Sequence, residues 1–212
     1  APDGGPGDGS YPVPQITKPT ALNSSIVAKR GAYDPATKLL KWTVIVNANR
    51  LDITGMTLTD ELDLSNQTGV IEDAAIAPLP TARCLASMDA TTPAYTVTMT
   101  KNGNGGLYTV VLNKKGSGAD NALGYGQVEI VYYTMATNPA FYANNATATF
   151  KNKVTADHVQ IAGETEPLRH LSAEATIKDA VSRVLDKEAT GYDYSTKEIT
   201  WELTVNANGM TL

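Results

Sequence analysis

The chain has 212 residues, of which 42% are hydrophobic and 18% are charged, and its formal net charge is −5 at pH 7. This composition excludes a wholly disordered chain and fits one domain with attachments or two small domains. The acidic balance disfavours general nucleic-acid binding, and two His with one Cys leave too few ligands for a usual zinc site. We therefore expect no metal, no cofactor and no nucleic-acid partner. The sequence has no apolar run of the ~18 residues needed to span a membrane, and its single Cys excludes an intrachain disulfide.

Short β-type runs dominate the chain after a Pro- and Gly-rich start at residues 1–21, which has the composition of a linker. From residue 22 onward, runs rich in Val, Ile, Thr and Tyr alternate with Gly- and Asn-containing turns. The expected strands are Leu39–Val46, Met56–Leu62, Tyr95–Met99, Leu107–Leu112, Val128–Thr134 and Ala146–Val154. This pattern predicts an all-β fold with an antiparallel β-sandwich at 22–160.

One later stretch, Ala173–Lys187, does not fit the strand pattern. Its apolar residues fall at helical spacing after a candidate N-cap at Ser172. Helix and irregular strand therefore both stay open for this stretch.

The chain also contains an internal repeat. The segment 31–49 recurs at 190–208, so that Trp42 corresponds to Trp201, and the spacing predicts a unit of about 160 residues. We expect a complete module at 22–160, a linker at 161–180 and the truncated start of a second, similar module at 181–212. The alternative is a natural C-terminal strand pair that packs on its own domain.

Two polar residues fall on the apolar faces of expected strands. Alternate side chains of a strand share a face. Asp60 alternates with apolar residues in Met56–Leu62, and Asn152 alternates with apolar residues in Ala146–Val154. Both side chains are therefore expected to point into the core.

A third polar residue, Lys29, shares a strand face with Val27 just before the repeated segment. The same alternation predicts that Lys29 is buried. The alternative assignment buries Ile26 and Ala28 instead, which would leave Lys29 outside the core.

Three polar side chains in one core are costly unless they compensate one another. Burial lowers the pKa of a Lys and raises that of an Asp, so the amine can act as a nucleophile and the acid can donate a hydrogen bond. In one interpretation Lys29 attacks the Asn152 carboxamide, protonated Asp60 polarises its carbonyl and shuttles protons, and an isopeptide bond forms as ammonia leaves. The alternative is a hydrogen-bonded Lys–Asp pair beside a satisfied Asn. Lys38 and Lys41 are rival amines.

Four segments in order resemble the collagen-binding-domain family, whose modules occur in wall-anchored adhesins and pilins of Gram-positive bacteria. They are 27–34, 40–47, 56–60 and 150–154. The resemblance covers about 22–160 and implies an immunoglobulin-like β-sandwich on a secreted, wall-attached protein. It also implies an isopeptide bond between Lys29 and Asn152, with Asp60 as the catalytic proton shuttle.

By the same resemblance Lys187 is the matching Lys of the second module, although one additional residue separates it from the following Tyr. The expected function is a structural stalk or adhesive repeat whose partners are neighbouring modules of the same surface protein. The alternative is a ligand-binding module for a host matrix protein, such as collagen, or for a glycan. An enzyme that acts on an external substrate is disfavoured, because no Ser or Cys motif accompanies the two His.

Overall fold

The structure is a computed structural model that describes residues 26–138, 146–182 and 185–206, and its regular elements are β-strands. In these ranges there is no helix with the length and apolar character to cross a membrane. The strands are β1 (Val27–Asp34), β2 (Leu39–Val46), β3 (Ile53–Leu62), β4 (Gln67–Gly69), β5 (Thr81–Ala86), β6 (Tyr95–Lys101), β7 (Leu107–Lys114), β8 (Gln127–Ala136), β9 (Ala146–Ile161), β10 (Leu171–Ser182), β11 (Leu185–Asp193) and β12 (Glu198–Val205).

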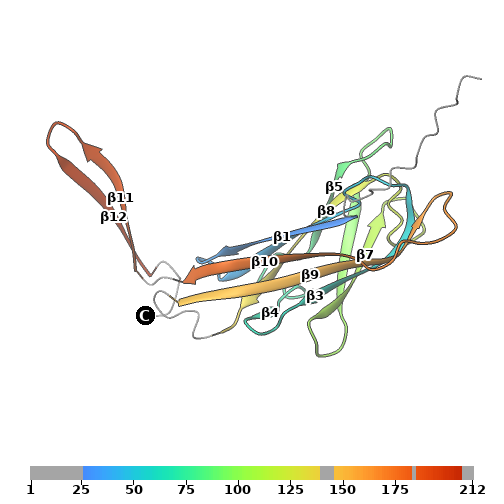
Figure 1. Ribbon diagram of the computed structural model, residues 1–212, viewed down its shortest axis with the longest axis horizontal. Helices are drawn as coiled ribbons and strands as arrows, with labels where there is room; N and C mark the ends of the chain where they lie inside the picture. Colours follow the sequence, from blue (N-terminus) through green and yellow to red (C-terminus); the bar gives the residue numbers. More distant parts are fainter. Residues whose placement is uncertain (1–25, 139–145, 183–184, 207–212) are drawn as a thin grey trace, which may run out of the picture.

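Two five-stranded antiparallel sheets form a β-sandwich (Figure 1). The first sheet has the order β1-β2-β8-β4, with β5 also paired to β8, and the second has the order β10-β9-β3-β7-β6. The prediction of an all-β, immunoglobulin-like sandwich is confirmed. Each of the six strands expected from the sequence lies within an observed strand, whereas the short β4 and β5 were not expected.

The stretch that the sequence left open is a strand. β10 pairs with β9 in the second sheet, from Leu171 opposite Ala156 to Ser182 opposite Ala146, and lies beside β1 (Figure 1). The predicted linker at 161–180 is therefore wrong for residues 171–180. A register shift between Ile177 and Ala180 interrupts the alternation of the strand, which explains why its apolar spacing looked helical.

The core lies between the two sheets and is built by the inward residues of the alternating strands. Trp42 on β2 is 0% exposed and lies opposite Gly31 of β1. A Cβ at Gly31 would collide with the Trp42 ring and would lie 2.8 Å from Cγ1 of Ile177 on β10. The absence of a side chain at Gly31 therefore allows β1 and β10 to pack closely against the Trp42 ring. This packing holds the first strand of the module against its last.

The repeated segment forms a separate hairpin, β11 and β12, that extends away from the sandwich (Figure 1). Trp201 is 53% exposed, in contrast to its buried counterpart Trp42. Other large apolar side chains exposed on the hairpin are Leu185, Tyr192, Tyr194, Ile199, Leu203 and Val205. A two-stranded hairpin with an exposed apolar face is marginal in water, so this segment needs a partner surface.

Candidate functional site

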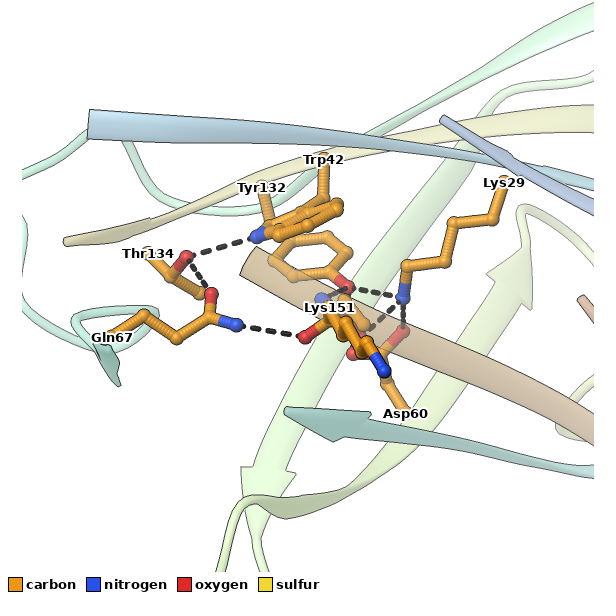
Figure 2. Close-up of polar contacts among 8 residues, drawn as sticks. Lys29, Trp42, Asp60, Gln67, Tyr132, Thr134 and Lys151 are labelled. Atoms are coloured by element: carbon orange, nitrogen blue, oxygen red, sulfur yellow. Dashed lines mark hydrogen bonds and ion pairs between the residues drawn. The ribbon is translucent and has the colours of Figure 1, made fainter. Parts of the chain in front are cut away.

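A cluster of polar side chains lies inside the sandwich, where strands of both sheets meet (Figure 2). Lys29 on β1 and Tyr132 on β8 come from the first sheet, and Asp60 on β3 and Asn152 on β9 come from the second. The cluster is buried: the side chains of Lys29 and Asp60 are 0% and 1% exposed, and Asn152 and Tyr132 are each 1% exposed.

The strand register places Asp60 and Asn152 diagonally on one face of the second sheet. Asp60 lies opposite Val154, and Leu62 lies opposite Asn152. Diagonal partners in an antiparallel pair are about 7–8 Å apart at Cα, so a group from the facing sheet fits between their side chains. Tyr132 supplies that group.

The amine of Lys29 is held by the three other members of the cluster (Figure 2). Nζ forms an ion pair with Oδ2 of Asp60 and donates hydrogen bonds to Tyr132 Oη at 2.7 Å and to Asn152 Oδ1 at 2.7 Å. Tyr132 Oη donates to Asp60 Oδ1 at 2.6 Å and accepts from Asn152 Nδ2 at 2.8 Å. The structure therefore brings together the three residues that the sequence singled out.

The rival assignments do not reach the cluster. Val27 is buried beside Lys29 on the inner face of β1, whereas Ala28 is exposed, so the alternative pairing of Ile26 with Ala28 is wrong. Lys41 is exposed on the outer face of β2, and Lys38 lies in the turn before β2 at a φ of 63°.

Burial dominates the electrostatics of Lys29. Desolvation lowers the pKa of its amine from 10.5 to about 8, although the Asp60 carboxylate opposes this shift. Nζ lies over the rings of Trp42 and Tyr132, 5.8 Å and 5.3 Å from their centroids. The environment therefore makes a neutral, nucleophilic amine accessible near pH 8 while the Asp60 carboxylate holds it in place.

Tyr132 is the member of the cluster that was not predicted as a functional residue. Alternation along β8 places one residue of the Tyr132–Tyr133 pair on the core face, where its ring would ordinarily be explained by packing. Val128, Ile130 and Tyr132 alternate on β8, and a buried Tyr hydroxyl needs a polar partner. The need of a core Tyr for a polar partner, together with the predicted burial of Asp60 and Asn152, could have identified Tyr132 from the sequence. Burial and the neighbouring Asp60 raise the pKa of Tyr132 well above 10, so the phenol stays protonated.

A second chain of buried hydrogen bonds supports the cluster (Figure 2). Trp42 Nε1 donates to Thr134 Oγ1 at 2.9 Å, and Thr134 donates to Gln67 Oε1 at 2.8 Å. Gln67 Nε2 then donates to the backbone carbonyl of Lys151 at 2.8 Å. These bonds tie β2 and β8 to the backbone just before Asn152, so the amide is presented to Lys29 from a fixed strand.

In the hairpin, Lys187 lies opposite the residue that is equivalent in the repeat to the strand partner of Lys29. Lys29 lies opposite Val44, and Lys187 lies opposite Leu203, the residue that corresponds to Val44 in the repeat. The additional residue of the second copy is absorbed by a register shift at Thr190. The spacing difference noted in the sequence therefore leaves the position of the Lys unchanged. Lys187 Nζ lies 4.5 Å from the centroid of the hairpin's own Trp ring.

No protein-family model matches the chain, and no curated protein matches it in sequence. Solved structures of Gram-positive surface proteins do match. The adhesin ACE of Enterococcus faecalis, described as binding its ligands by the collagen Hug model, has a TM-score of 0.50 and 12% identity over 74% of this chain and 51% of its own. The collagen-binding domain of a Staphylococcus aureus adhesin has a TM-score of 0.48 and 16% identity over 74% of this chain and 99% of its own. The sequence-based resemblance to collagen-binding domains is thus confirmed in fold.

Proposed function

We propose that this chain is a structural and adhesive module of a Gram-positive surface protein, locked by an isopeptide bond between Lys29 Nζ and Asn152 Cγ. The observation that carries the proposal is the buried contact of the Lys29 amine with the Asn152 carboxamide, at 2.7 Å between Nζ and Oδ1, beside the Asp60 carboxylate. A C=O bond is about 1.2 Å long, so the Asn152 carbonyl carbon lies within about 4 Å of the amine. That distance is close to a near-attack geometry.

The reaction balances without any external reagent. The neutral Lys29 amine attacks Cγ of Asn152, the Nζ–Cγ bond forms, and the Cγ–Nδ2 bond breaks. One proton leaves Nζ for Asp60, and one proton reaches Nδ2, which departs as ammonia. Asp60 ends the reaction in the state in which it began, so this residue is the catalyst and Lys29 and Asn152 are the cross-linked pair.

The topology gives such a bond a mechanical role. Lys29 and Asn152 are 123 residues apart and lie on β1 and β9, in different sheets. A covalent link between them closes nearly the whole module into one loop, and cross-links of long loops stabilise by roughly 2–5 kcal/mol. Load that enters at β1 and leaves through β9 would bypass the strands in between. The bond also resists reduction, which suits a secreted protein attached to the cell wall, without a disulfide.

The intact mass of the purified chain tests the proposal. We expect the wild type to be lighter than its calculated mass by about 17 Da, the mass of the ammonia that is lost. Lys29→Ala and Asn152→Ala should each have their full calculated mass. Lys187→Ala is the matched control and should retain the deficit. A wild-type chain at its full mass would overturn the cross-link.

The rate of cross-linking should depend on pH through the Lys29 amine. Because burial lowers its pKa to about 8, the neutral fraction of the amine rises about tenfold per pH unit below pH 8 and levels off above it. The experiment starts from unfolded chain that has not yet cross-linked and still has its full mass. This chain is diluted into refolding buffers between pH 5.5 and 9.5, and the rate of the loss of about 17 Da, followed by mass spectrometry, should follow this curve. A rate that stays flat across the range would show that deprotonation of Lys29 does not limit the reaction. Asn152→Ala provides the baseline.

We also propose that β11 and β12 begin a second module and that Lys187 is its cross-linking residue. The proposal is supported by the register of the hairpin, which keeps Lys187 opposite Leu203 despite the additional residue. The exposed apolar face of the hairpin corresponds to the face that is buried in the first module. Neighbouring modules are therefore the first partners to expect.

A ligand-binding adhesin module is the second candidate function. The shared fold with structures described as collagen-binding favours it, as does a shallow groove of 390 Å³ on the outer face of the first sheet. Arg30 and Arg83 on this face lie 3.7 Å and 2.6 Å from the carboxylate of Glu129. Binding of the wild type to immobilised collagen, measured by surface plasmon resonance, separates this candidate from a purely structural module.

A further inference from the structure

The hydroxyl of Tyr132 lies between the nucleophile and the leaving group of the proposed reaction. Its oxygen is 2.7 Å from Nζ of Lys29, which attacks, and 2.8 Å from Nδ2 of Asn152, which departs. Its own proton is donated to Oδ1 of Asp60 at 2.6 Å. The hydroxyl thus uses its one donor and both acceptor positions inside the cluster.

The leaving nitrogen needs a proton, and the contacts show where one can come from. An amide nitrogen departs as ammonia only if it is protonated as the Cγ–Nδ2 bond breaks. Among the described residues, the Asp60 carboxylate accepts hydrogen bonds from Lys29 and Tyr132. Asn152 Nδ2 donates to Tyr132 and not to Asp60. The carbonyl of Asn152 accepts from Lys29, so Asp60 is not the group that polarises it in this arrangement.

We propose that Tyr132 is a further catalytic residue, which relays a proton from Asp60 to the leaving nitrogen of Asn152. This inference rests on the proposed isopeptide bond. As Nζ attacks Cγ, Asp60 Oδ2 takes a proton from Nζ. The carboxyl then turns that proton toward Tyr132 Oη, which accepts it and gives its own hydroxyl proton to Nδ2. Ammonia leaves, and Tyr132 and Asp60 return to their starting states.

The relay follows from a change of hydrogen-bond direction during the reaction. In the planar amide the lone pair of Nδ2 is delocalised, so the nitrogen can only donate to Tyr132 Oη. When Cγ becomes tetrahedral, the nitrogen gains a localised lone pair and can accept from the same oxygen. Tyr132 stays protonated because burial disfavours its phenolate, so its proton is available throughout. Tyr132 and Asn152 are each 1% exposed, which leaves bulk water a poor substitute.

Tyr132→Phe tests the relay, because the ring stays and only the hydroxyl is lost. Loss of a general acid typically slows a reaction by roughly 10²–10⁴-fold, so we expect the 17 Da loss after refolding to slow by about 100-fold or more. Tyr95→Phe is the matched control, since the Tyr95 hydroxyl is also buried but donates to the carbonyl of Leu123, at 3.2 Å, outside the cluster. Tyr95→Phe should cross-link at the wild-type rate.

Fluorinated tyrosines placed at position 132 separate a relay from a packing role and keep the test decisive if Tyr132→Phe folds poorly. They retain the hydroxyl and its contacts but make the phenol more acidic. A relay predicts that the rate rises with phenol acidity, and a structural role predicts no trend. Equal rates for the wild type and Tyr132→Phe, or a rate independent of phenol acidity, would overturn the relay and leave the isopeptide bond standing. A wild-type chain that keeps its full mass would overturn both.

Discussion

Replacing Asp60 by Ala is expected to abolish the cross-link and to leave the Lys29 amine buried without a counter-charge. Removing one partner of a buried ion pair typically costs about 3–5 kcal/mol, because the remaining charge is desolvated and uncompensated. Both side chains are almost fully buried, at 0% and 1% exposure, so solvent screening offers little relief. The loss of a long-loop cross-link adds roughly 2–5 kcal/mol. We therefore expect Asp60→Ala to be among the most destabilising single substitutions in the module.

Two comparisons separate these contributions in guanidinium unfolding followed by circular dichroism. Lys29→Met combined with Asp60→Ala also lacks the cross-link but leaves neither charge of the pair in the core, so this double variant should unfold at a higher denaturant concentration than Asp60→Ala. Glu61→Ala changes the next residue of β3, whose side chain is exposed on the opposite face, and should behave like the wild type. Equal stability of Asp60→Ala and the double variant would show that the buried amine does not need the carboxylate as a counter-charge.

Trp42→Ala should lower the free energy of unfolding by about 3–5 kcal/mol, whereas Trp201→Ala should change it by less than about 1 kcal/mol. The two residues hold equivalent positions in the repeat, but Trp42 is 0% exposed and Trp201 is 53% exposed. Truncating Trp42 opens a cavity between the sheets and removes the hydrogen bond from Nε1 to Thr134. Truncating Trp201 removes side-chain surface that water already covers.

Far-UV circular dichroism is the appropriate probe for this pair, because tryptophan fluorescence changes when either residue is removed. Intact mass should be recorded for both variants, since the Trp42 ring also lines the Lys29 amine at 5.8 Å. A large destabilisation by Trp201→Ala would contradict the exposed position of the hairpin. It would mean that the apolar face of β12 is covered in solution, for example by a second copy of the chain.

The sequence alone located most of the candidate site, because strand alternation is a local property. A side chain in a strand points to the face opposite that of its neighbours, so the burial of Asp60 and Asn152 could be predicted from the flanking apolar residues. The same pattern favoured the burial of Lys29 but left Ile26 and Ala28 open as the buried pair. The repeat likewise identified two equivalent strand pairs, one containing Trp42 and the other containing Trp201. The alternation needed only the residues on either side of each position, and the repeat needed only a comparison of two segments of the sequence.

The tertiary structure decided which buried groups meet and in what order. Tyr132 enters the site because β8 faces β3 and β9 across the sandwich, and the diagonal register of Asp60 and Asn152 leaves room for its hydroxyl. β10 joins the second sheet by pairing with β9, and a register shift within this pair obscures the alternation in its sequence. A similar shift in the hairpin keeps Lys187 opposite its strand partner. Sheet pairing and register depend on contacts between residues far apart in the chain, so the local pattern determined the faces of the strands and only the folded arrangement determined their partners.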